Sequence, residues 1–224
     1  MVAATLWAAA ATYLLVIRPW HPRWGASADE VNQRLPGDEL IPSPRLETTR
    51  AIAIAAPPER VWPWLIQLGT GRAGWYSYDF LENIMGLGVR SANRIVPDLQ
   101  HLAVGDVIPA APPSYLGFRV LSFEPARTLV TSTSIDMITG QSLDAEGPLA
   151  GRRLDASWTF SLRRLDESRC RLIARLRVGY SPSLLNDLAV RAVIEPAHFV
   201  MERGMLRGIK QRAETVGQTS KPDR

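Results

Sequence analysis

Four polar residues near the C-terminus have the spacing of one helix face. They are Arg191, Glu195, His198 and Glu202, at intervals of four, three and four residues. A histidine between two carboxylates can take up and return a proton, so this set could act as a general acid or base if it faced a cavity. The alternative is a solvent-exposed ladder of opposite charges. In that case the apolar stripe from Leu185 to Leu206 packs on the rest of the protein.

Metal and cofactor chemistry has weak support in the sequence. Glu195 and His198 have the spacing of half a di-iron carboxylate motif, but such a site needs carboxylates from further helices, which the sequence does not offer. The sequence also has no phosphate-binding glycine loop, no nucleophile elbow and no His-rich metal spacing. We therefore expect no metal and no cofactor.

A second group of residues is aromatic and could line an apolar pocket. The glycine-flanked segment 71–88, GRAGWYSYDFLENIMGLG, supplies several of its rings. Flat rings bury apolar area, while hydroxyl and indole N–H groups orient a ligand. The alternative is that these rings fill the junction between a helix and a sheet. Tyr76 joins His198 and Glu195 as a weak catalytic candidate. The predicted ligand-binding residues are Trp62, Trp75, Tyr76, Tyr78, Trp158, Phe160 and Phe199.

A third group combines carboxylates and arginines without a diagnostic spacing. It consists of Asp79 and Glu82 with Arg72, Arg90 and Arg94. The carboxylates could do acid–base work, and an arginine could hold an anionic head group. Surface and helix-capping roles are the simpler interpretation.

The elements that must position these groups follow from hydrophobic periodicity. Alternation of apolar and polar residues predicts strands over 48–55, 107–108, 118–123, 128–132, 154–165 and 170–178. Helical spacing predicts helices over 59–68, 78–85 and 183–216, the last kinked near Pro196. In the final strand, apolar residues alternate with Arg171, Arg175 and Arg177, so we expect one face of that hairpin to be solvated.

The chain divides into four parts by composition. We expect a hydrophobic segment over 1–20, a Pro-rich linker over 21–46, one domain over 47–216 and a disordered tail over 217–224. The linker has room for a short helix over 27–35, with Ser27 and Glu30 as a capping box.

Several stretches resemble a bacterial branch of the SRPBCC superfamily, which includes START and polyketide cyclase/dehydrase-like proteins. They are LPGDELIPSPRLETTRAI (35–52), APPERVWPWLIQLG (56–69), GRAGWYSYDFLEN (71–83), VGD (104–106), SWTF (157–160) and MERGMLRGIKQRAE (201–214). The resemblance implies an α+β helix-grip fold, in which a curved antiparallel sheet of about six to seven strands wraps round a long C-terminal helix and encloses a hydrophobic cavity. It implies no catalytic residue.

The N-terminus predicts contact with a membrane. Residues 1–17 carry no charge, and Arg18 and Arg23 follow. This length is at the lower limit for a bilayer span, and the positive-inside rule would leave the domain on the cytoplasmic side. The alternatives are a soluble docking helix or a signal sequence. We therefore expect a membrane-associated protein with its domain on the cytoplasmic side, or a cytoplasmic one.

Composition narrows the classes of partner. The formal net charge is +4 with scattered basic residues, so we expect no nucleic-acid binding. The single cysteine, Cys170, excludes an intrachain disulfide and a cysteine-based zinc site. The expected function is the binding of a small hydrophobic molecule such as a lipid, isoprenoid or polyketide. The alternatives are a cyclase- or aromatase-like enzyme and an interaction protein whose own side chains fill the cavity.

Overall fold

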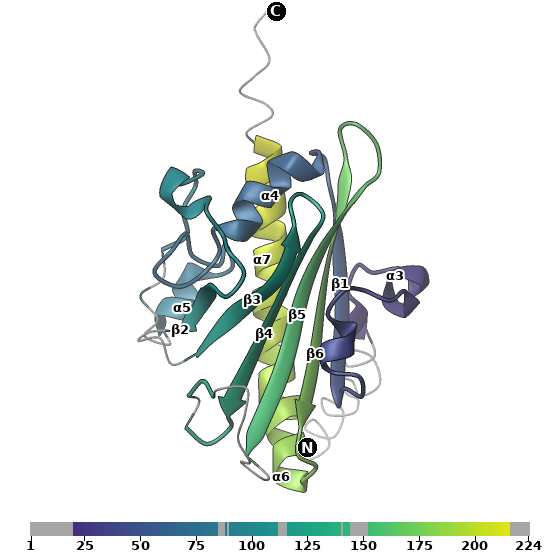
Figure 1. Cartoon of the computed structure of the whole chain (residues 1–224), viewed down its shortest axis with the longest axis vertical. Coiled ribbons are helices and arrows are strands. Elements are labelled where there is room, and N and C mark those ends of the chain that lie inside the picture. Colours follow the sequence, from purple (N-terminus) through teal and green to yellow (C-terminus); the bar gives the residue numbers. More distant parts are fainter. Residues whose placement is uncertain are drawn as a thin grey trace, which may run out of the picture.

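The structure, a computed structural model, describes residues 20–84, 88, 90–111, 116–139, 141–143 and 152–215. Within these ranges the strands form a six-stranded antiparallel sheet with the spatial order β1-β6-β5-β4-β3-β2. A long C-terminal helix lies along one face of the sheet (Figure 1). The predicted α+β class and helix-grip arrangement are therefore confirmed. The strands are β1 (Leu46–Ile54), β2 (Val107–Ala111), β3 (Leu116–Glu124), β4 (Thr128–Asp136), β5 (Arg153–Arg164) and β6 (Cys170–Tyr180).

Strand register decides which side chains face the C-terminal helix. Trp158 on β5 lies between Leu176 on β6 and Thr131 on β4, so these three residues share the inner face of the sheet. β5 and β6 are buried on both faces through most of their length, because a second layer covers the outer face.

That outer layer is the segment 20–45, which we expected to be a linker. Its α3 (Ala28–Asn32) and η3 (Asp38–Leu40) pack over β6 on the outer face (Figure 1). Its η2 (His21–Arg23) lies at the edge strand β1 and contacts the C-terminal helix. The capping box predicted at its helix is present: Ser27 N–H donates to the Glu30 carboxylate at 2.8 Å, and Glu30 N–H donates to Ser27 Oγ.

This layer corrects the expectation that the arginine face of the last hairpin is solvated. Arg175 is only 2% exposed, and Arg171 and Arg177 are also mostly covered. The guanidinium groups bond to backbone carbonyls and carboxylates of the outer layer, so burial does not leave their charges without partners.

The remaining helices flank the sheet. α4 (Pro58–Ile66) begins after Pro57 and buries Val61, Trp64 and Leu65, while α5 (Asp79–Ile84) and η4 (Pro97–Leu99) belong to the connection to β2. The C-terminal helix consists of α6 (Leu184–Ala189), the π-helical turn η5 (Val190–Ile194) and α7 (Glu195–Thr215).

Where the sequence predicted a kink, near Pro196, the structure has this π turn. Proline has no N–H to donate to the carbonyl four residues before it, and its ring crowds that carbonyl. The wider π turn directly before Pro196 relieves the conflict without ending the helix.

The predicted N-terminal anchor and C-terminal tail lie outside the described residues, as do parts of the loop between β4 and β5. Among the residues that are described, no helix combines the length and the apolar character needed to cross a bilayer.

Candidate functional site

Three of the four residues on the polar face of the C-terminal helix, Glu195, His198 and Glu202, are turned inward, whereas Arg191 is exposed. Glu195 and Glu202 are buried, whereas Leu185 and Leu188 of the opposite stripe are 74% and 61% exposed. The alternative of a solvent-exposed charge ladder is therefore wrong for this face, and the stripe packs inward only in its later part, at Leu206. These carboxylates turn inward because the sheet places a buried cation opposite them.

That cation is Arg50 on β1, which is fully buried on the inner face. Its Nη1 donates to Glu202 Oε2 and lies 3.1 Å from His198 Nδ1, and its Nε donates to the His21 carbonyl at 2.9 Å. The second oxygen of Glu202 accepts a hydrogen bond of 2.8 Å from the Trp158 indole N–H. β1, β5 and α7 thus meet in one buried polar cluster.

Sequence reasoning missed Arg50, although a signal was present. Strand alternation places it on the same face as Ile52 and Ile54, where an arginine interrupts an apolar row. A charged residue on a predicted core face needs a buried partner, and His198 and Glu202 on the polar helix face were available.

The contact with Arg50 fixes the tautomer of His198. A guanidinium group can only donate, so Nδ1 accepts and the proton resides on Nε2. Burial is the main cause that lowers the pKa of His198 to about 4; Arg50 lowers it further and Glu202 opposes the shift. The imidazole is therefore neutral at neutral pH.

Hydrogen-bond donors in this cluster remain without acceptors. Arg50 Nη2, His198 Nε2 and the Thr48 hydroxyl are buried and have no hydrogen-bond partner among the described residues. Because a buried donor without an acceptor costs about 1–3 kcal/mol, the cluster is suited to receive an acceptor from a bound molecule.

An aromatic cluster lies beside these donors. The Trp158 ring stacks on Trp75, with ring centroids 5.8 Å apart and an interplanar angle of 25°. Phe118 and Phe160 approach the same ring at 5.1 and 4.8 Å, and His198 meets it edge-on at 5.4 Å. Three predicted ligand residues, Trp75, Trp158 and Phe160, are thus brought together with His198. Phe118 was not predicted.

The structure places two further predicted ligand residues away from this cluster. Trp62 on α4 packs against Phe123, with 6.2 Å between ring centroids. Phe199 lies under the Arg50 guanidinium at 5.2 Å and contacts Trp20 edge-to-face at 5.6 Å, on the side where the chain enters from the N-terminus.

Tyr76 has features of a structural residue. Its φ of 56° lies in the left-handed region, and its carbonyl packs so closely on Gly208 that a Cβ there would be 2.0 Å from the oxygen. Its hydroxyl accepts a hydrogen bond of 2.6 Å from Gln67. Burial raises the pKa of Tyr76 to about 12, against the opposing effects of the Gln67 hydrogen bond and nearby arginines, so the phenol stays protonated at neutral pH.

Tyr78 lies in a separate surface groove of about 490 Å³ between the 76–91 connection and α7. The aromatic ring sits over Gly204, where an added Cβ would be 2.8 Å from the ring. In the same groove Asp79 accepts hydrogen bonds from the Ser91 N–H and hydroxyl, which closes the loop.

The third predicted group does not gather at one site. Asp79 bonds to Ser91, and Arg72 donates to the Ile66 carbonyl. Arg90 is exposed, and the side chain of Glu82 lies outside the described residues. Nor do three or more His, Cys, Asp or Glu side chains come together as metal ligands anywhere in the described ranges.

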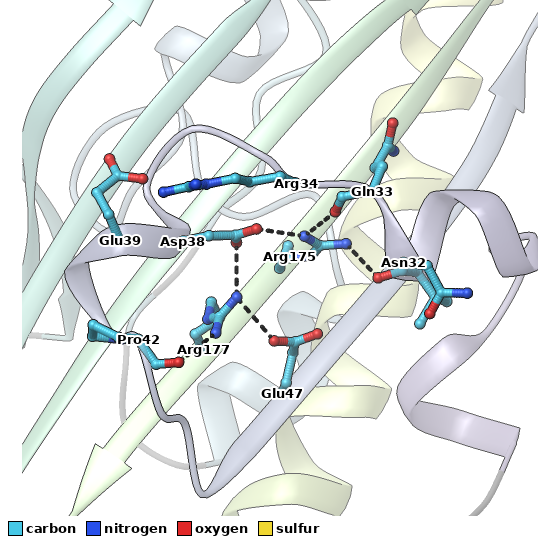
Figure 2. A pocket seen from close by; sticks show the side chains of 10 residues that line it. Asn32, Gln33, Arg34, Asp38, Glu39, Pro42, Glu47, Arg175 and Arg177 are labelled. Carbon is cyan, nitrogen blue, oxygen red and sulfur yellow. Dashed lines mark hydrogen bonds and ion pairs between the residues drawn. The ribbon is translucent and has the colours of Figure 1, made fainter.

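A second pocket, of about 330 Å³, lies on the outer face of the sheet. Figure 2 shows Arg175 and Arg177 on β6 beside Asp38, which pairs with both, while Arg177 also pairs with Glu47. Arg175 donates five hydrogen bonds, to Thr49, Gln33, Asp38, Glu30 and Val31, so none of its N–H groups is left for a ligand. This site holds the outer layer on the sheet.

Comparisons with known proteins found similar solved structures only, all at low sequence identity. No protein-family model and no curated protein matches the chain. Solved structures do match: a hypothetical protein from Helicobacter pylori is 10% identical, with 80% of this chain and 95% of that chain covered and a TM-score of 0.48. A polyketide cyclase-like protein from Corynebacterium glutamicum is 14% identical, with 80% and 97% covered and a TM-score of 0.40.

A norcoclaurine synthase variant from Thalictrum flavum, in complex with a transition-state analogue, is 10% identical, with 78% and 96% covered and a TM-score of 0.44. The strand order and the long C-terminal helix of this chain are those of the α+β helix-grip arrangement. Similarity at this level concerns the fold alone, so what those proteins bind or catalyse carries no statement about this chain.

Proposed function

We propose that the chain binds a small hydrophobic ligand with a neutral hydrogen-bond acceptor between α7 and the inner face of the sheet. The observation that carries the proposal is the contact between two clusters. The rings around Trp158 offer apolar area, while Arg50 Nη2 and His198 Nε2 are buried donors without acceptors among the described residues. Lipid, isoprenoid and polyketide-like molecules with a carbonyl group combine these two requirements.

The charge balance favours a neutral acceptor over a carboxylate. The positive charge of Arg50 is already paired with Glu202, and His198 is neutral. Glu195 adds a buried carboxylate to the same helix face. An anionic head group would therefore meet negative charge, whereas a ketone, ester or amide carbonyl needs only the two donors.

Binding fits this geometry better than cyclase-like catalysis. A general base needs a free lone pair, but the lone pair of His198 Nδ1 accepts from Arg50. The pKa of Tyr76 is about 12, which leaves its phenol protonated. The cluster can orient and polarise a carbonyl, but these residues offer no group ready to remove a proton.

The test uses two compounds with the same ring body. 2-Acetylnaphthalene carries a carbonyl and 2-ethylnaphthalene does not, and binding of each to the full chain is measured by quenching of tryptophan fluorescence. One hydrogen bond contributes about 1 kcal/mol net, so we expect the ketone to bind about fivefold more tightly. The purified protein is also extracted with organic solvent, and the extract is analysed by mass spectrometry for a stoichiometric compound.

A pair of histidine variants localises the effect. His198→Phe removes the Nε2 donor, keeps a ring and leaves Arg50 Nη2 in place, so it should reduce the preference for the ketone. His101→Phe changes an exposed histidine and should leave the preference intact. Failure of both compounds to bind, with an empty extract, would overturn the proposal and favour an interior filled by the protein's own side chains.

A further inference from the structure

The start of the C-terminal helix exposes a row of large apolar side chains. Leu184, Leu185 and Leu188 on α6 are 87%, 74% and 61% exposed, and Val193 in η5 is 64% exposed. Val200 on α7 continues the row. We call these five residues the α6 face. A helix of a globular protein normally turns such residues toward its core, so a concentration of them at one end marks an interaction surface.

The uncharged N-terminal segment joins the folded part beside this face. Trp20 contacts Phe199 on α7, the residue before Val200 in the chain, and His21 lies 3.5 Å from Glu195. The uncharged stretch 1–17 therefore leads into the described structure at Trp20, which contacts the helix next to Val200.

The residues around the α6 face suit the boundary between lipid and water. Trp20 is half exposed, and tryptophan prefers the level of lipid head groups. Arg23 and Arg191 are exposed on the neighbouring segments, and Arg18 follows the uncharged stretch. Cationic side chains at the rim of an apolar surface attract anionic lipid head groups.

We infer that the α6 face docks on an anionic lipid bilayer, with α6 and η5 lying in the interface between lipid and water. A segment of 17 mostly alanine and leucine residues is at the lower limit for stable insertion by itself. Burial of the α6 face adds apolar area to the same contact. The inference is independent of the ligand between α7 and the sheet.

The experiment measures binding of the full chain to sedimented vesicles. Vesicles of equal phosphatidylcholine and phosphatidylglycerol are compared with phosphatidylcholine alone. We expect stronger binding to the anionic vesicles, and a loss of about tenfold or more in a triple variant of the α6 face, because each leucine withdrawn from lipid forfeits part of its transfer energy. The triple variant is Leu184→Gln, Leu185→Gln and Leu188→Gln.

A matched control changes three exposed apolar residues elsewhere, and it should bind as the native chain does. The control variant is Val104→Gln, Ile138→Gln and Leu165→Gln. All six positions are exposed, so thermal unfolding should be unchanged in both variants. Equal vesicle binding of the two variants, or no vesicle binding by the native chain, would overturn the inference. A native dimer that only the α6 variant dissociates would assign the face to a second copy instead.

Discussion

Two arginines on neighbouring strands are almost completely buried, on opposite faces of the sheet. Arg175 on β6 faces outward and is 2% exposed, while Arg50 on β1 faces inward and is fully buried. All five N–H groups of Arg175 have acceptors. Arg50 bonds to Glu202, His198 and the His21 carbonyl, but its Nη2 has no acceptor among the described residues.

The difference separates two uses of a buried charge. A saturated arginine holds segments of the chain together, as Arg175 holds the outer layer on the sheet. An arginine with donors to spare carries an energetic cost within the fold, and that cost is removed when a ligand supplies an acceptor. The two arginines are buried to nearly the same degree. What distinguishes them is whether every N–H group has an acceptor.

The largest effect should come from the saturated arginine. Arg175→Met removes five hydrogen bonds and leaves buried carbonyls of the outer layer without donors, so we expect the free energy of unfolding to fall by about 4 kcal/mol. Urea denaturation measures the loss. The exposed Arg119→Met on β3 is the control and should change stability by less than about 0.5 kcal/mol. If Arg175→Met also lowered the free energy of unfolding by less than about 0.5 kcal/mol, Arg175 would not be a clamp that holds the outer layer on the sheet.

Removing the inner arginine should cost somewhat less and should also affect binding. Arg50→Met leaves the Glu202 carboxylate buried with only the Trp158 N–H as partner, and we expect a loss of about 3 kcal/mol. The preference for 2-acetylnaphthalene should disappear at temperatures where the variant is still folded. Retention of that preference would remove Arg50 from the binding site.

Lowering the pH should destabilise the inner cluster through His198. Its pKa is about 4 in the folded protein, compared with an ordinary value of 6.5. Between these two pH values the unfolded chain binds a proton at His198 that the folded chain does not bind. The stability that the neutral imidazole contributes is complete above pH 6.5 and declines as the pH falls toward about 4.

Urea denaturation at about pH 7.5 and about pH 5 should show an extra loss of about 2 kcal/mol in the native chain relative to His198→Phe. The variant is the reference because carboxylates such as Glu30, whose pKa is also lowered, titrate equally in both proteins. Parallel pH profiles of the two proteins would mean that His198 is not buried in its neutral form.

The smallest net effect should follow from removing both charges of the inner pair. In Arg50→Met with Glu202→Met neither charge is left alone, so we expect stability within about 1 kcal/mol of the native value. Discrimination between the ketone and the hydrocarbon should nevertheless be lost. If the double variant is instead as unstable as Arg50→Met alone, the pair is a structural clamp like Arg175.

The sequence predicted the elements well because each depends on local pattern. Alternation located six strands, helical spacing located α4 and the C-terminal helix, and Ser27 with Glu30 predicted the capping box. It also identified His198, Glu195 and Trp158 as residues of interest, because a histidine among carboxylates and a tryptophan on an apolar strand face are local features.

What the sequence alone determined, therefore, is the order and type of the elements and the residues that each element can present. Only the tertiary structure decided which face of α7 turns inward, since that depends on Arg50, about 150 residues earlier in the chain. It also decided that Arg175 is a clamp, because the outer layer that covers it comes from a segment without regular periodicity. Pairing between distant charges leaves no period in the sequence, so only the folded chain reveals it.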